Sequence, residues 1–299
     1  MATKQRSRVR RPSNRDRAPR YVEPVLDPDW QNPYAPSAQE RQANLRAVRT
    51  FALRRTLAQS IVVGVVVLAL LVGVVAMAWL PIVGLAVALG YFFFLRRSLA
   101  RFATRGDALA SAVLSVFKPG GTAKDRQRLT TVLDRLSATF GVDGVSAFII
   151  EDPDYNAALV PNGAALSLFV TSAMMSDFDL IEIEGVVAHC LARHRLGLLN
   201  REAAASMISM SDEARRELAG AGNAYRADEV AAAAIRYPQG LAEALRKCSR
   251  HVASPSSFFS SAAFAQWRWI WFDVRSDRRA SDMGDLDDVE LRARALDEW

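Results

Sequence analysis

The stretch from Leu57 to Leu95 constrains the fold most, because none of its 39 positions carries a charge. One straight helix of that length would measure ~58 Å, whereas the hydrocarbon core of a bilayer is only ~30 Å thick. Two spans of roughly 17 to 20 residues fit the stretch instead. The run Ala78-Trp79-Leu80-Pro81 marks the break between them. We therefore predict a transmembrane helical hairpin over residues 57–95.

Basic residues flank this stretch on both sides. Arg54 and Arg55 precede it, and Arg96 and Arg97 follow it. Since basic flanks stay in the cytoplasm, we expect both ends of the hairpin on the cytoplasmic side and its tip outside. The chain is thus expected to be a multi-pass protein of the cytoplasmic membrane, with the lipid bilayer as one partner.

The N-terminal part carries most of the positive charge. Residues 1–55 hold 13 Lys and Arg against 5 acidic residues, although the whole chain has a net charge of only +6. Residues 1–36 lack apolar periodicity and are expected to form a disordered basic tail. A solvated tail that sets the topology is the favoured interpretation. Contact with anionic lipid is an alternative, and nucleic acid is the least favoured partner. The capping box from Ser37 to Glu40 predicts a juxtamembrane helix over residues 37–56.

Residues 98–299 have the pattern of a cytoplasmic globular domain of mainly α (α+β) class. Two short strands are expected, Val145 to Ile150 and Ala165 to Ala173. The amphipathic or Ala-rich segments expected to be helical are Asp107 to Phe117, Asp125 to Phe140, Ala203 to Leu218, Ala227 to Ile235 and Leu241 to Cys248. Two cysteines, Cys190 and Cys248, give no disulfide framework and fit a reducing compartment.

The segment from Glu182 to Asn200 is the predicted central helix of this domain. At helical spacing its apolar stripe comprises Ile183, Val186, Val187, Cys190, Leu191, His194 and Leu198. His189 and Arg193 are four residues apart, so they share a helix face beside the stripe. A zinc metallopeptidase needs two imidazoles at this spacing, with a Glu directly after the first. Only the first imidazole is present.

The run E-I-E-G-V-V-A-H, which ends at His189, resembles the histidine helix of HtpX-like membrane zinc metallopeptidases, relatives of the CAAX prenyl peptidases. The resemblance implies a zincin-like helical domain with a small β-sheet, preceded by a membrane hairpin. It places the catalytic Glu of the family on Cys190 and the second His ligand on Arg193. The third ligand falls on Ala224, and the retained Asp228 matches a supporting Asp.

Two short matches extend the resemblance, and one departure limits it. Asn156-Ala157 and Val170 to Ser172 match positions of the family whose edge strand lines the cleft and pairs with extended substrates. The family carries a second hairpin after the histidine helix, whereas residues 201–222 are too polar and too short for one.

These replacements lead us to expect a degenerate site with no bound metal or cofactor. Arg193 places a permanent cation where the family holds a dication. We expect it to pair with Asp228, the alternative being that Arg193 points into solvent. Cys190 and His194 are four residues apart and would form a displaced metal pair; packing of a buried Cys beside a buried His is the preferred interpretation. His194 lies about 140° from His189 around the helix, so the two are not expected to share a metal.

The function expected from this combination is that of a membrane-anchored pseudopeptidase that binds or scaffolds a membrane protein or complex. The alternative is a divergent zinc metalloendopeptidase with displaced ligands. An aromatic cluster, Phe258 to Phe272, is interpreted as core packing, the alternatives being a membrane-interface belt or a partner surface.

Overall fold

A computed structural model describes residues 34–74, 80–103, 106–207, 211–220, 222–274 and 289–299. The predicted disordered tail lies almost entirely outside these ranges, as do Ala78 and Trp79 of the predicted break. The main elements, in chain order, are α1 (Ala38–Val74), α2 (Leu80–Ala103), α3 (Gly106–Val116), α4 (Ala123–Phe140), β1 (Val145–Ile150), β2 (Ala157–Asn162), β3 (Ala165–Thr171), α5 (Ser172–Asp177), α6 (Leu180–Arg195), α7 (Leu199–Met207), α8 (Asp212–Ala219), α9 (Asn223–Ala232), α10 (Pro238–Arg250), η2 (Phe258–Ser260), α11 (Phe264–Trp267), η3 (Arg268–Ile270) and α12 (Val289–Asp297). The chain is therefore mainly helical with one small sheet, as predicted.

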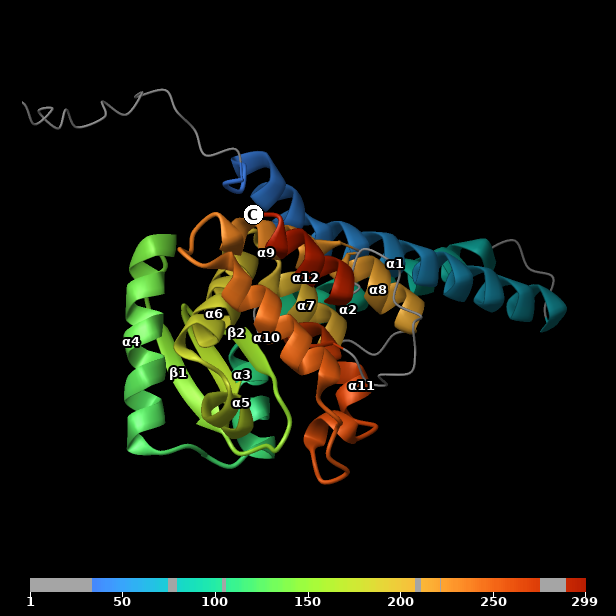
Figure 1. Ribbon diagram of the computed structural model, residues 1–299. Coiled ribbons are helices and arrows are strands. Elements are labelled where there is room, and N and C mark those ends of the chain that lie inside the picture. Colours follow the sequence, from blue (N-terminus) through green and yellow to red (C-terminus); the bar gives the residue numbers. More distant parts are fainter. Residues whose placement is uncertain (1–33, 75–79, 104–105, 208–210, 221, 275–288) are drawn as a thin grey trace, which may run out of the picture. The chain divides into compact units, whose positions relative to one another are not determined.

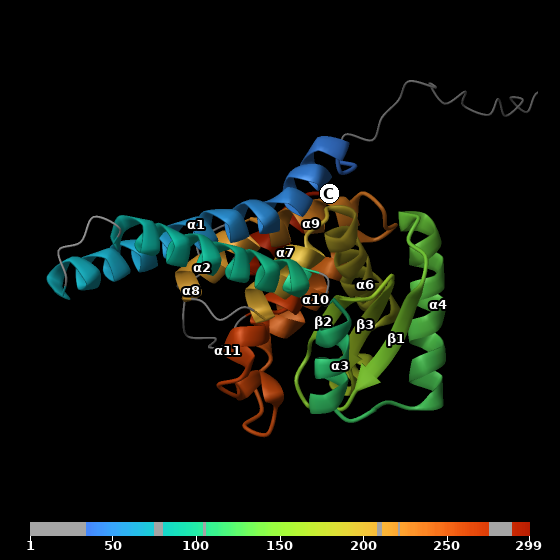
Figure 2. The same ribbon diagram turned by 180° about the vertical axis from the view of Figure 1, so that it is seen from behind.

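The first two helices lie side by side (Figures 1 and 2). α1 begins where predicted, with the Ser37 hydroxyl accepting a hydrogen bond of 3.0 Å from the backbone N–H of Glu40. It continues without interruption to Val74, so the predicted juxtamembrane helix and first span form one helix. Its stretch Ala38–Val67 is long and apolar enough to cross a membrane, by length and composition. The apolar part of α2, Ile82–Phe94, is shorter.

The first turns of α1 dock on the rest of the domain through polar side chains. The Asn44 amide donates a hydrogen bond of 2.8 Å to the Leu196 carbonyl and accepts one of 2.7 Å from Arg201. One turn earlier, Glu40 forms an ion pair of 3.0 Å with Arg226. These contacts fix the start of α1 on the domain that follows it.

The sheet has the order β1-β3-β2, with β1 parallel and β2 antiparallel to β3. β3 is the second predicted strand, and it is central; the expectation that this strand lies at the edge was wrong. The edge strand β2 was not predicted, because Pro161 argues against a strand. Proline is tolerated there because an edge strand leaves some of its N–H groups outside the ladder.

Helices lie on both faces of the sheet, with α3 on one side and α4 on the other (Figure 2). One face packs on α4 and α6 in the main hydrophobic core, through Ile149, Ala157, Leu159, Leu166, Leu168 and Val170. The opposite face packs on α3 and the aromatic cluster, through Ile150, Ala158, Val160 and Phe169. Phe264 and Trp271 of that cluster are 0% and 1% exposed, so the interpretation of the cluster as core packing was correct.

The crossing of α6 and α10 depends on two glycines. A Cβ at Gly185 would lie 2.7 Å from the backbone nitrogen of Leu241, and one at Gly240 would lie 2.5 Å from the Ile181 carbonyl oxygen. No larger residue fits at this distance, so the Gly of the E-I-E-G-V run has a packing role.

After α6, the single helix expected over Ala203 to Leu218 is two helices, α7 and α8. The Ser211 hydroxyl caps the start of α8 by accepting a hydrogen bond of 3.4 Å from the Ala214 N–H.

Candidate functional site

The site is built on α6, which runs through the core. A capping box starts the helix, with the Glu182 carboxylate accepting a hydrogen bond of 2.6 Å from the Asp179 N–H. The predicted apolar stripe is buried except for His194, which is half-buried. His189 and Arg193, on the flank of that stripe, are 2% and 3% exposed.

Arg193 is held by four hydrogen bonds. Its Nε and one terminal nitrogen donate to the two carboxylate oxygens of Glu202, at 2.9 and 2.6 Å. The terminal nitrogens also donate to the carbonyls of Trp269, at 3.1 Å, and Ile270, at 3.0 Å. The predicted pair with Asp228 was wrong, because Glu202 on α7 lies closer in the chain and presents both oxygens to the planar guanidinium. The alternative of Arg193 in solvent was also wrong, since the side chain is buried.

Asp228 binds two other residues. One carboxylate oxygen lies 2.7 Å from Nδ1 of His189. Arg292 of α12 donates to both oxygens, at 2.6 Å through Nε and at 3.0 Å through a terminal nitrogen. All three side chains are buried, so Asp228 joins α6, α9 and α12 through charge-assisted hydrogen bonds.

Burial determines the protonation of this network. It lowers the pKa of His189 to about 4, with Asp228 opposing and Arg292 and Arg193 adding to the shift, so the imidazole is neutral at pH 7. Burial would raise the pKa of Asp228, but Arg292, and then His189, outweigh burial and lower it. The neutral ring therefore donates from Nδ1 to the Asp228 carboxylate.

A small cavity of about 50 Å³ lies at the centre of these contacts. Its lining includes His189, Arg193, Glu202, Ala224, Trp271 and Arg292. One water needs ~10–15 Å³, so the cavity has room for only a few waters.

The outer edge of β2 is covered by the chain itself. The Phe272 N–H donates to the Ala157 carbonyl at 2.7 Å, and Ala158 forms a β-bridge with Trp271. The Asn156 amide exchanges hydrogen bonds of 3.0 Å with the backbone of Asp273 in both directions. The segment from Trp271 to Asp273 therefore covers the first part of this edge, from Asn156 to Ala158, where an extended peptide would otherwise pair.

The structure brings four of the predicted site residues together at one cavity, whereas the other two, Cys190 and His194, do not line it. His189, Arg193 and Ala224 line the same cavity, and Asp228 holds His189 from behind. Cys190 is fully buried beside Arg193, and burial raises its pKa to about 12. His194 lines a different hollow, with Gly141 and Pro161. Cys190 does not line that hollow.

Sequence reasoning missed the two partners that hold the site together, Glu202 and Arg292. The signal for Arg292 was its position as a basic residue within the apolar pattern of residues 289–296. Glu202 carried no signal of its own, because an acidic residue in a polar helix is ordinarily solvated.

The side chains at the cavity do not fit a zinc ion. His189 and Glu202 are possible ligands, but Arg193 already binds both Glu202 oxygens, and two guanidinium groups line the same cavity and would repel a dication. Across the described ranges, no group of three or more His, Cys, Asp or Glu side chains converges in a way that would hold a metal.

Comparison of the sequence with protein-family models and with curated proteins gives no match.

Proposed function

We propose that this chain is a membrane-anchored pseudopeptidase of HtpX-like, zincin-like fold, which binds or scaffolds a membrane protein or complex without metal-dependent catalysis. The observation that carries the proposal is the position of Arg193. It lies one turn after His189, where the second imidazole of a metallopeptidase belongs, and four hydrogen bonds hold it there. A buried cation held by four hydrogen bonds in that place supports a structural role for it.

The covered first part of the β2 edge supports a non-catalytic role independently. A peptidase of this kind needs an open strand edge or groove for an extended substrate. Here Trp271, Phe272 and Asp273 pair with that edge, and the adjacent cavity measures only about 50 Å³.

The first two helices are the surface best suited to a partner. The aromatic cluster is core, which leaves the apolar faces of α1 and α2 as the extended exposed hydrophobic surface of the described residues. Their large apolar side chains that are at least half exposed include Leu53, Val62, Val65, Val66, Ile82, Leu85, Phe93 and Phe94. In the proposed arrangement α1 and α2 form a two-span hairpin in the cytoplasmic membrane, with the domain in the cytoplasm.

The catalytic part of the proposal is tested with the full chain in liposomes and casein as substrate. We expect no cleavage that zinc increases and chelator stops. Chelator-sensitive cleavage that disappears in a His189→Ala variant would support the alternative, a divergent metalloendopeptidase.

The scaffolding part is tested by isolating the chain from native membranes in mild detergent and sizing the complex. We expect a complex larger than the free chain, containing a membrane protein in near-stoichiometric amount. The double variant Val62→Asn, Val66→Asn should release this partner. Val252→Asn, on an exposed residue of the domain outside α1 and α2, is the matched control and should retain it. The proposal would be contradicted if the chain from native membranes carried no partner protein, or if both variants lost the partner to the same extent.

A further inference from the structure

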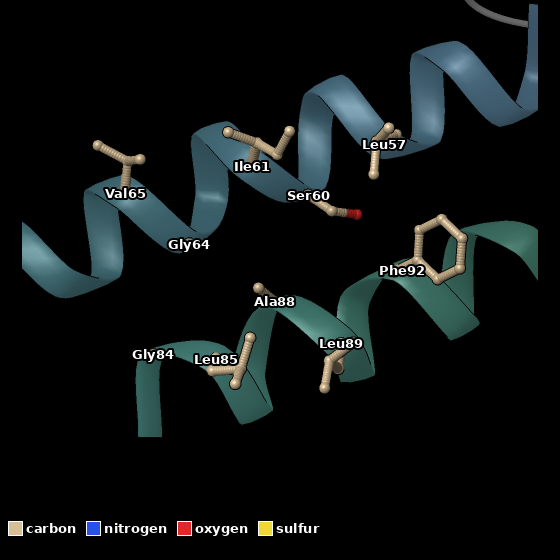
Figure 3. A pocket seen from close by; sticks show the side chains of 10 residues that line it. All are labelled: Leu57, Ser60, Ile61, Gly64, Val65, Gly84, Leu85, Ala88, Leu89 and Phe92. Atoms are coloured by element: carbon tan, nitrogen blue, oxygen red, sulfur yellow. The ribbon is translucent and has the colours of Figure 1, made fainter. Parts of the chain in front are cut away.

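A groove of about 460 Å³ runs between α1 and α2. Figure 3 shows the two helices facing each other across it. Small residues form its floor (Ser60, Gly64, Gly84 and Ala88), and larger apolar side chains such as Leu57, Leu85 and Phe92 form its sides. Small residues four apart on both helices allow their backbones to approach closely. A Cβ at Gly64 would lie 3.1 Å from the Cβ of Ala88, so the two helices touch at this point.

The Ser60 hydroxyl is the polar group of this groove. Ser60 is 5% exposed, and in Figure 3 its hydroxyl points into the space between the helices. Within the described ranges it has no hydrogen-bond partner, and neither has the hydroxyl of Thr56, one turn earlier and 2% exposed. A serine within a helix ordinarily bonds the carbonyl four residues before it, which Ser60 does not do. A ligand that carries a hydrogen-bond acceptor would remove the cost of burying this hydroxyl unpaired.

Positive charge lies at one end of the groove. Leu57 and Phe92 are close together at that end, so the antiparallel helices also bring Arg54 and Arg96 there. Arg54, Arg96 and Arg97 are exposed. Ser60 follows Arg54 by six residues, which is ~9 Å along the helix axis.

We propose that the groove binds one anionic glycerophospholipid. Its phosphate and headgroup lie at the arginines, an ester carbonyl accepts the hydrogen bond of Ser60, and an acyl chain lies along Gly64 and Gly84. The order of these groups in the lipid, with anion, then acceptor, then hydrocarbon, matches the order of Arg54, Ser60 and Gly64 along α1. The proposal rests on the proposed membrane insertion of α1 and α2.

The test counts lipids bound to the full chain by native mass spectrometry, after incubation in detergent with phosphatidylglycerol or phosphatidylcholine. Wild type should retain one phosphatidylglycerol in preference to phosphatidylcholine. Gly84→Leu fills the groove and should weaken this binding about tenfold or more, whereas Gly90→Leu, the same change on α2 where an added Cβ meets no atom within 4 Å, should leave it unchanged. Ser60→Ala, which preserves packing, should weaken it about fivefold, as expected for one hydrogen bond. The double variant Arg54→Gln, Arg96→Gln should abolish the preference for the anionic lipid.

Equal binding by Gly84→Leu and Gly90→Leu, or unchanged binding by Ser60→Ala, would overturn the proposal. So would photo-crosslinking from a benzophenone residue at Leu85 to a protein in place of a lipid. Carbonate extraction of the same membranes separates the two claims. A wild-type chain that washes off refutes membrane insertion, and with it the lipid site. A chain that stays inserted without lipid selectivity refutes the lipid site alone.

Discussion

Arg193 and Glu202 form a buried bidentate ion pair that joins α6 to α7, with N–O distances of 2.9 and 2.6 Å. The same guanidinium donates to the carbonyls of Trp269 and Ile270, so it also fixes the segment that covers the edge of β2. One side chain thereby links α6 to α7 and to the segment that covers the first part of the β2 edge.

Removing the charge of Glu202 should destabilise the fold strongly. Glu202→Gln leaves the Arg193 cation buried without a counter-ion, for which we expect a loss of about 3–5 kcal/mol in the free energy of unfolding. Urea unfolding in detergent measures this. Glu243→Gln, at a carboxylate paired with Arg246 but 52% exposed, is the matched control and should change it by about 1 kcal/mol or less. Equal effects of the two changes would show that the Arg193 pair is not structural.

Removing the buried charge of Asp228, which binds His189 and Arg292, should also destabilise the fold strongly. Asp228→Asn removes the buried negative charge that accepts from Arg292 and weakens the bond to His189, so we again expect a loss of about 3–5 kcal/mol in the free energy of unfolding. Asp297→Asn changes the same residue type at an ion pair with Arg246, where the aspartate side chain is 44% exposed. The free energy of unfolding of this control should stay within about 1 kcal/mol of the wild-type value. A small effect of Asp228→Asn would show that α12 is held by its apolar contacts alone.

Stability should fall on acidification. The pKa of His189 is about 4 in the folded chain and 6.5 without burial. Between these values the unfolded chain binds more protons than the folded one. The contribution of His189 to the free energy of unfolding is therefore complete above pH 6.5 and is lost as the pH falls towards 4. The lowered pKa of Asp228 acts in the same direction at still lower pH. We expect His189 to contribute about 3 kcal/mol to this loss. His189→Gln should flatten the pH dependence of the free energy of unfolding between pH 6.5 and 4. An unchanged slope would show that His189 is not the group that causes this dependence.

The docking of α1 should depend on Gly197. Its φ is +75°, and an added Cβ would lie 3.1 Å from the Arg41 carbonyl oxygen. Gly141 has a similar φ of +59°, but its Cβ would meet only the Arg195 guanidinium, at 3.9 Å. Both substitutions to Ala carry the backbone cost of about 1 kcal/mol, whereas Gly197→Ala must also displace α1. Spin labels on α1 and on the domain should therefore show a broadened distance distribution in Gly197→Ala alone. Matching distributions in both variants would refute a close contact at Gly197.

Sequence reasoning found most elements of the domain because their signals are local. The capping box at Ser37, the periodicity of α6 and the β-branched run of β1 each depend on neighbouring residues. β2 was missed because Pro161 is acceptable only at the edge of a sheet, and edge position is a property of the whole fold. The convergence of His189, Arg193, Ala224 and Asp228 was anticipated from the resemblance. The partner of Arg193 was not, since the choice between Glu202 and Asp228 depends on how α7 and α9 pack against α6.

The most direct test of the central claim is the zinc content of the full chain, purified in mild detergent without chelator or a histidine tag and measured by inductively coupled plasma mass spectrometry. The account predicts zinc far below one ion per chain, because guanidinium groups line the cavity where a metal would lie. About one zinc per chain, the stoichiometry of a metallopeptidase centre, would contradict it. Alanine variants of His189, Cys190 and His194 would then identify the ligands.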